Sequence, residues 1–335
     1  MKPPVFNTED QLPLFKQIVR YISMEIEKGV YDKGFRLLSI NDFSEKYNVA
    51  RDTVERAYKE LKKEGYITSS MGKGYFVIGG KEDKLKVLLI FNKLSSYKKI
   101  VYYSLLETLG DQARVDLQIH HYDPALLKEI VENNLGKYHY YVIMPHFFQP
   151  ADEETFQQTL NKIPAGELVL LDKNLSGFTE NIAVFQDFRN DTADALESEK
   201  KSMDKYLHFT VVFPENINHP PEIIEGIKTF CKRNNKTFQQ VEYVDEIALE
   251  AGTVYIVISE DDLALLIKKL RKSPFEMGKD LGVISFNETV LKELLDITVI
   301  TTDFEMMGQK AAQLMLNREF LHVRNPFKMI KRSSL

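Results

Sequence analysis

The first part of this chain takes its structure from residues 13–77, which read PLFKQIVRYISMEIEKGVYDKGFRLLSINDFSEKYNVARDTVERAYKELKKEGYITSSMGKGYFV. Apolar residues recur at every fourth position from Leu14 to Ile26, which is the spacing of one helix face. Gly29 follows where a helix commonly ends in a left-handed residue. The pattern predicts a first helix that ends just before this glycine.

Two further helices and a hairpin are predicted from the same stretch. Ser39 stands three residues before Asp42, a capping-box-like start for a short second helix. After a turn at residues 48–49, a third helix is expected over about residues 51–64, so the pair forms a helix-turn-helix. Two short β-rich runs then flank Met71-Gly72-Lys73-Gly74, which predicts a hairpin whose tip can approach a duplex closely, a candidate wing.

The whole stretch resembles the winged helix-turn-helix of GntR-family bacterial transcription regulators. The shared features are the PL-x-x-QI opening, the G-x-x-x-x-G-x-x-L turn, the V-x-R-x-TV start of the third helix and the G-x-G-x-x-V wing, in that order. The resemblance implies that the chain reads double-stranded DNA, with the start of the third helix against base edges and other groups on phosphates. The DNA-binding residues are expected to be Ser39, Asn41, Arg51, Thr53, Arg56 and Lys73.

The chain departs from the usual pattern of that family, which has Pro-Ser-Glu-Arg where this chain has Leu38-Ser39-Ile40-Asn41. Asn41 stands where an arginine is usual, so phosphate attraction is weaker there. Ala50 replaces the serine that usually caps the third helix, a change that typically costs about 1 kcal/mol of stability. Glu55 stands where many relatives carry a second arginine, and a carboxylate facing DNA either accepts from a cytosine amino group or repels phosphate. No operator sequence is therefore carried over from the family.

Composition is that of an ordinary globular protein with room for two or three domains: 335 residues, 44% hydrophobic and 28% charged. The net charge of −5 is unevenly distributed. Residues 1–80 hold 13 Lys and Arg against 11 Asp and Glu, which gives +2, and residues 81–335 hold 31 against 38, which gives −7. A domain at +2 is only mildly basic, so DNA affinity must come from the placement of its cations and from the use of two copies. We therefore expect a homodimer on a pseudo-palindromic operator.

The single cysteine, Cys231, excludes an intrachain disulfide and suits a reducing compartment. The first residues contain no apolar signal segment, and the longest apolar run is far too short to cross a membrane. We expect a cytoplasmic protein.

After residue 80 the pattern changes to apolar runs that alternate with helical stretches. This rhythm predicts βαβ units and parallel sheets, an α/β fold arranged as two doubly wound subdomains. The predicted organisation is a DNA-binding domain over 1–80, a linker over 81–84, and an effector-binding and dimerisation domain over 85–335. Its two subdomains are expected over about 85–181 with 303–320, and about 182–302. The nine predicted strands lie at 86–91, 116–122, 140–144, 167–171, 182–185, 209–213, 238–243, 254–258 and 282–286.

Two segments of this second part, 257–266 and 278–316, resemble the C-terminal part of the lac-repressor family and of periplasmic sugar-binding proteins. They carry VISEDDLALL, then GVISFN, then T-x-I-T-T-D-F-x-x-M-G-x-x-A-A. The combination resembles the arabinose-repressor-like branch of GntR regulators, which implies a type I periplasmic-binding-protein-like domain that senses a sugar. In this family a ligand lies between the subdomains, and ligand contacts occur at the positions of Glu260 and Asn287.

Parallel α/β sheets bind ligands outside the carboxyl ends of their strands. Sugars require paired donors and acceptors beside an aromatic face. The effector is expected to be a monosaccharide of the pentose or 6-deoxyhexose type, because Arg189 is the only arginine among the candidates and a phosphate would need more positive charge. A phosphorylated or non-sugar metabolite remains the alternative, as does activation of transcription in place of repression. The candidate effector-binding residues are Asn92, His146, Asp172, Arg189, Glu260 and Asn287.

Enzymatic, metal-binding and receptor functions find little support. No glycine-rich phosphate loop, nucleophile elbow or metal signature is present, so neither catalysis nor a cofactor is expected. His120 and His121 are predicted to end a strand and so to point to opposite faces, which prevents both from binding one metal ion. The second part is too short for a pyridoxal-phosphate aminotransferase domain, and a secreted sugar receptor would need a signal peptide.

Overall fold

The computed structural model describes Phe6 and residues 12–27, 29–70, 72–79, 84–147, 153–214 and 219–335. Residues 81–83 of the predicted linker and Met71 of the predicted wing lie outside the described residues. The chain forms two compact units. The first contains residues up to 87 with 111–116 and 131–139, and the second contains the remainder of the chain to Leu335.

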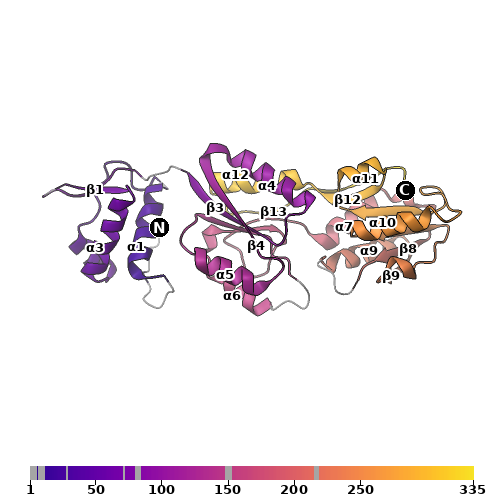
Figure 1. Ribbon diagram of the computed structural model, residues 1–335, viewed down its shortest axis with the longest axis horizontal. Helices are drawn as coiled ribbons and strands as arrows, with labels where there is room; N and C mark the ends of the chain where they lie inside the picture. The colour runs from indigo at the N-terminus through magenta and orange to yellow at the C-terminus, as the bar shows by residue number, and fades with distance from the viewer. Residues whose placement is uncertain are drawn as a thin grey trace. The chain divides into compact units, whose positions relative to one another are not determined.

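The N-terminal stretch folds as the predicted winged helix (Figure 1). Its core forms because the apolar faces of the first and third helices meet, and Ile18, Ile22, Val54, Tyr58 and Leu61 are at most 1% exposed. The hairpin strands pair in antiparallel register from Ile67 opposite Val77 to Ser70 opposite Gly74. The elements are α1 Leu14–Glu27, α2 Ile40–Tyr47, α3 Arg51–Lys63, β1 Ile67–Ser70 and β2 Gly74–Val77.

Local signals that fix the ends of these helices agree with the sequence. The Ser39 hydroxyl accepts a hydrogen bond from the Asp42 amide at 3.1 Å and caps α2. Asn48 and Gly29 adopt left-handed backbone at φ 51° and 67°, as expected after a helix. Ala50 provides no side-chain cap to α3. The Thr53 amide instead donates to the backbone oxygen of Ala50 at 3.0 Å. Tyr58 of the same helix is anchored by donating to Leu38 O at 2.8 Å.

The second part of the chain contains two six-stranded sheets. The first has the strand order β13-β7-β6-β5-β3-β4 and the second β14-β12-β11-β10-β8-β9. The second sheet is parallel except for β14, which runs antiparallel to β12. The strands are β3 Leu85–Phe91, β4 Ala113–Ile119, β5 Tyr140–Ile143, β6 Leu168–Asp172, β7 Ile182–Phe185, β8 His208–Val212, β9 Thr237–Val241, β10 Thr253–Val257, β11 Gly282–Phe286, β12 Thr298–Thr302, β13 His322–Arg324 and β14 Phe327–Ile330.

Helices cover these sheets, as the two-subdomain α/β prediction requires. The longest two, α4 and α12, pack side by side, and α12 also contacts β6 and β7 of the first sheet (Figure 1). In the other subdomain α7 packs against α9. The helices are α4 Ser96–Leu109, α5 Pro124–Asn134, α6 Glu153–Asn161, α7 Phe188–Ser198, α8 Lys200–Met203, α9 Glu222–Arg233, α10 Glu260–Leu270, α11 Val290–Leu294 and α12 Phe304–Asn317, with short 3-10 turns at Gly110–Gln112, Ala165–Glu167 and Val244–Glu246.

The structure corrects the sequence analysis in three details. Strands β12, β13 and β14 were not predicted. Strand β7 pairs with β6 and β13, so residues 182–185 lie in the first sheet and not in the subdomain predicted over 182–302. Strand β4 ends at Ile119, so the two histidines that follow it lie outside the strand: His120 is buried, whereas His121 is exposed with φ 50°. The alternation of faces argued for this pair therefore does not apply.

Candidate DNA-binding surface and ligand cavity

The start of α3 presents the predicted reading residues. Arg51 is exposed at the first position of the helix, and Thr53 is half-buried two residues later. Val54, which is fully buried, and Tyr58 hold the opposite side of the helix in the core. The buried side fixes the orientation of α3, and Arg51 is left free to reach a partner outside the domain.

Glu55, the unusual acidic residue of this helix, is paired within the helix. Its carboxylate lies 2.7 Å from the Nζ of Lys59, one turn later. The hydrogen bond with Lys59 lowers the pKa of Glu55 and raises the pKa of Lys59. The two opposite charges therefore lie side by side on the exposed face of the helix.

Arg56 projects in a different direction from Arg51. Five residues at 100° each place it about 140° around the helix axis from Arg51. Its guanidinium lies 3.7 Å from the centre of the Phe15 ring of α1, a cation–π contact within the domain. Of the two predicted arginines, Arg51 alone stands at the start of α3, where recognition helices meet base edges.

The remaining predicted DNA-binding residues are exposed, and one basic residue was overlooked. Asn41 lies in the first turn of α2, and Lys73 lies in the turn between the wing strands. The Ser39 hydroxyl already serves as a helix cap. Arg36 was not proposed from sequence. Its backbone forms an antiparallel β-bridge with Phe76 of the wing. Its guanidinium lies against Gly74, where an added Cβ would be 3.4 Å from Arg36 Nε. Arg36 thus adds positive charge beside the wing.

A cavity of about 80 Å³ lies at the carboxyl ends of the first sheet. Four successive strands contribute to it, because parallel strands end at the same edge. Asn92 follows β3, Tyr122 follows β4, His146 follows β5 and Asp172 ends β6. The lining is completed by Lys93, Tyr97, Lys98 and His219.

Asp172 organises the polar side of this cavity. Its carboxylate accepts a hydrogen bond from His146 Nε2 at 2.8 Å and another from the amide of Gln186. Burial alone would raise the pKa of Asp172, but the hydrogen bond and charge of His146 and the charge of Lys98 hold it below its usual value. Burial lowers the pKa of His146. At neutral pH the pair is therefore a carboxylate bound by a neutral imidazole N–H.

Lys98 is a buried ammonium group beside this pair. Its side chain belongs to a residue that is 3% exposed, and its Nζ donates a hydrogen bond to Asn92 Oδ1. Burial lowers the pKa of Lys98 to about 8, against the opposing attraction of Asp172. The protonated form predominates at neutral pH, so the cavity contains a buried cation. Lys93 lies at the same cavity, with its Nζ 5.9 Å from the centre of the Tyr122 ring.

Comparison with known proteins identifies the N-terminal domain. Residues 14–77 match the family of bacterial regulatory proteins of the gntR type. The HTH-type regulator YurK of Bacillus subtilis is 41% identical over 86 residues, which cover 26% of this chain and 34% of YurK. Residues 14–77 are a GntR-family DNA-binding domain. The repressor YtrA of the same organism is 28% identical over 87 residues, which cover 26% of this chain and 64% of YtrA. The match to YurK thus spans about a third of that relative's length.

Solved structures resemble most of this chain in fold. The trehalose repressor of Escherichia coli superposes with a TM-score of 0.58 at 16% identity, covering 74% of this chain and all of that one. The lac repressor bound to ONPG gives 0.59 at 14% identity over 90% of this chain. A periplasmic binding protein/LacI regulator from Alkaliphilus metalliredigens, complexed with D-xylulofuranose, gives 0.57 at 13% identity over 75% of this chain and 99% of that one. These likenesses show the predicted α/β fold, joined in this chain to a GntR domain.

Three predicted effector residues line the cavity and three do not. Asn92, His146 and Asp172 are brought together. Arg189 is exposed in the first turn of α7, and Glu260 is exposed at the first residue of α10. Asn287 is half-buried after β11 with φ 63°. The rule that ligands bind at strand ends also selected Glu260 and Asn287, because they follow the carboxyl ends of β10 and β11 in the second sheet.

Three lining residues that the sequence analysis missed lie slightly beyond the strand ends. Lys93 is the second residue after β3, and Tyr97 and Lys98 form the first turn of α4. The strand-end rule extended to the first turn of the following helix would have found them.

Among the described residues, no helix is long and apolar enough to cross a membrane.

Proposed function

We propose that this chain is a transcription regulator of bacterial sugar-utilisation genes, acting in the cytoplasm, whose affinity for DNA is changed by a small sugar. The observation that carries the proposal is the union of two parts in one chain. One part is a GntR domain with Arg51 exposed at the start of its recognition helix. The other has the fold of known repressors and a polar cavity at the carboxyl ends of its first sheet.

Repression is the proposed direction of control. Two relatives of the GntR domain, YtrA and NagR of Bacillus subtilis, are named transcriptional repressors, and the solved neighbours include the trehalose and lac repressors. In the proposed mechanism the sugar closes the two subdomains and changes the geometry of a dimer. The spacing or freedom of its two GntR domains then changes as well. A regulator engaged by the sugar would show the opposite sign of coupling.

The experiment that tests this function is a titration of DNA with the full chain, with and without sugar. The DNA is first selected from a random duplex pool by the chain itself. Allosteric couplings are typically about 1–3 kcal/mol, so the sugar is expected to weaken DNA binding by about 5–150-fold. Affinity that no member of a sugar panel changes would refute the sugar-responsive function. A gain of affinity would refute repression alone.

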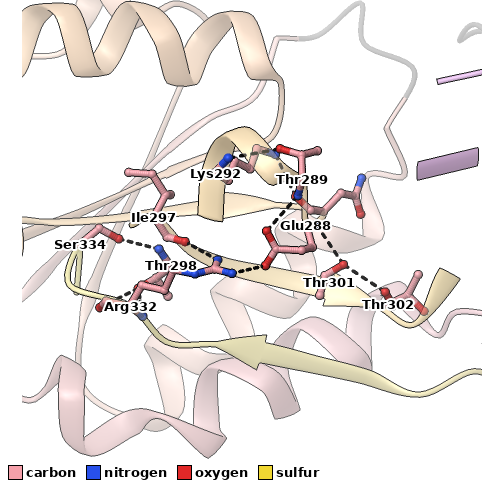
Figure 2. Close-up of polar contacts among 10 residues, drawn as sticks. Glu288, Thr289, Lys292, Ile297, Thr298, Thr301, Thr302, Arg332 and Ser334 are labelled. Carbon is pink, nitrogen blue, oxygen red and sulfur yellow. Dashed lines mark hydrogen bonds and ion pairs between the residues drawn. The ribbon is translucent and has the colours of Figure 1, made fainter. Parts of the chain in front are cut away.

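The proposed homodimer is supported by an inverted helix in the second subdomain. Helix α11 directs its lysine inward and its apolar residues outward: Lys292 is 2% exposed, whereas Leu291 and Leu294 are 59% and 78% exposed. Lys292 Nζ donates to Phe286 O at 2.5 Å and to Asn287 O at 3.0 Å, which compensates its burial. Figure 2 shows Lys292 on α11. Apolar side chains that are exposed side by side favour a surface that a partner covers. We propose that a second copy of this chain covers Leu291 and Leu294.

Hydrogen bonds join the segment that carries α11 to the C-terminal residues and to β12. Arg332, near the C-terminus, donates to the Glu288 carboxylate at 2.6 Å and to Ile297 O at 2.8 Å. Ser334 accepts from the Thr298 amide at 2.7 Å. Figure 2 shows this network joining the C-terminal segment to the loop before α11 and to β12.

Replacing Leu291 and Leu294 together by aspartate is expected to convert the dimer to monomers. Burying one leucine contributes about 1.5–3 kcal/mol, so losing two and introducing charge should raise the dimer dissociation constant more than about 100-fold. Sedimentation velocity measures the change, and Glu293→Gln on the same helix is the control. A wild-type monomer, or a double variant that stays dimeric, would count against this interface.

A further inference from the structure

Resting on the proposed function, we propose that the effector is an anionic sugar, and that its phosphate or carboxylate group is bound by Lys98 and the first turn of α4. The sequence analysis favoured a neutral sugar because Arg189 was the only arginine among its candidates. The cavity draws its positive charge from lysines instead. Lys93 and Lys98 both line it, and Asp172 is its one carboxylate among the described residues.

The argument begins with the incomplete hydrogen bonding of Lys98. An ammonium group has three donors. Within the described part of the chain, the Nζ of Lys98 has one hydrogen-bond partner, the neutral side-chain oxygen of Asn92, and no carboxylate within 4.0 Å. A buried charge without a counter-ion is costly, and a charge-assisted hydrogen bond to an anion removes that cost.

Asp172 does not fill the role of counter-ion. Both of its oxygens are engaged, one by His146 and the other by Gln186. Its charge attracts Lys98 through space but leaves the donors of the ammonium group available. The cavity therefore contains the Lys98 ammonium group, whereas the nearby Asp172 carboxylate is hydrogen-bonded to His146 and Gln186.

The start of α4 offers further donors at the same place. Helix α4 has 14 residues and begins at Ser96, and its N-cap residue Ser95 makes no side-chain capping hydrogen bond. The first amide groups of such a helix have no partner within the helix and favour an anion. Lys98 lies in this first turn, so its ammonium group and the helix terminus can act on one anionic group. A neutral sugar would leave the ammonium with neutral acceptors only, and a cationic ligand would be repelled by both lysines.

Thermal stability of the full chain, measured with matched pairs of probes, tests the inference. Glucose, ribose and arabinose are each compared with the corresponding sugar phosphate, and glucose also with gluconate. Inorganic phosphate tests the anionic group alone. A probe at 100 times its Kd stabilises the folded chain by about 2.7 kcal/mol, a clear rise in melting temperature. We expect at least one anionic sugar to bind about 10-fold or more tightly than its neutral parent, the usual advantage of a charge-assisted hydrogen bond.

Variants separate the cavity from other basic surfaces. Lys98→Met keeps the length of the side chain and is expected to remove most of the preference for the anionic sugar. Lys93→Gln changes an exposed side chain, so it leaves the core intact, and it should also weaken binding of the anionic sugar. This variant keeps the test valid if Lys98→Met fails to fold. Lys279→Met, at a lysine whose side chain is 73% exposed, and Arg51→Ala in the GntR domain should leave the preference intact.

The outcomes distinguish this inference from the function on which it rests. A neutral sugar that binds as tightly as its phosphate or acid would overturn the inference and leave a sugar-responsive regulator standing. An anionic preference unchanged by both Lys98→Met and Lys93→Gln would also overturn it. Binding of non-sugar metabolites in place of every sugar, charged or neutral, would overturn the proposed function itself. A phosphate that outperforms a carboxylate, or the reverse, identifies which anion the site selects.

Discussion

Replacing Arg51 by alanine is expected to weaken binding of the full chain to its selected DNA by about 1–3 kcal/mol, or roughly 5–150-fold, as for an arginine that reads a base. Arg51 is exposed at the first position of the recognition helix, and no side chain among the described residues forms an ion pair with it. Its replacement therefore breaks no ion pair among the described residues, and the expected loss is one of DNA binding. Fluorescence anisotropy at fixed salt measures the effect, because phosphate contacts vary strongly with ionic strength.

Two other variants of α3 serve as controls for Arg51. Lys63→Ala removes one positive charge from the far end of the helix, where the lysine lies 3.6 Å from Glu60. Arg56→Ala removes a charge that stacks on Phe15. Both are expected to lower the affinity less than Arg51→Ala does. Equal losses for all three would mean that bulk charge, and not a base contact, provides the binding.

Gly308→Ala is expected to lower the free energy of unfolding by about 2–3 kcal/mol, the upper range for overpacking. In a helix interior this substitution ordinarily adds about 1 kcal/mol of stability. Here an added Cβ would lie 2.0 Å from Ser104 Oγ and 2.4 Å from Val101 O of α4. Backbone cannot move aside as a side chain can, so α4 and α12 must separate.

The same substitution should weaken sugar binding, because Lys98 and Tyr97 stand at the start of the displaced α4. Urea unfolding followed by circular dichroism gives the stability, and sugar titration gives the affinity. Gly166→Ala is the matched control, because its Cβ would meet only the Phe320 ring, at an ordinary 3.4 Å. A stability equal to wild type in Gly308→Ala would contradict the close α4–α12 packing.

Much of this fold was predictable where a residue pattern repeats along one element. The spacing of Ile18, Ile22 and Ile26 was sufficient for α1, and apolar runs located most strands. Strand β12, TVITT, was missed although all its residues are β-branched and favour strands, because its three threonines interrupt the apolar run that located the other strands. All five of its residues are buried, and partners far along the chain, such as Arg332 and Ser334, satisfy its polar groups. Such partners are not visible in the local sequence.

The candidate sites were predictable to the extent that topology alone brings residues together. Strand ends correctly grouped Asn92, His146 and Asp172. Lys98 was missed because its proposed role in binding an anion depends on its burial and on how many of its own donors the neighbouring residues occupy. Lys292 of α11 shows the same limit: its pattern of leucines around a lysine predicts the leucines inside, whereas the backbone carbonyls of Phe286 and Asn287 draw the lysine inward.

The central claim is that one chain couples sugar binding to DNA binding. It is tested most directly by isothermal titration of the sugar into the full chain, alone and saturated with its selected DNA. Coupling is reciprocal, so the DNA must change the Kd of the sugar by the same factor as the sugar changes the Kd of the DNA, an expected weakening of about 5–150-fold. A sugar Kd that is identical with and without DNA would contradict the account, even if each ligand binds tightly by itself.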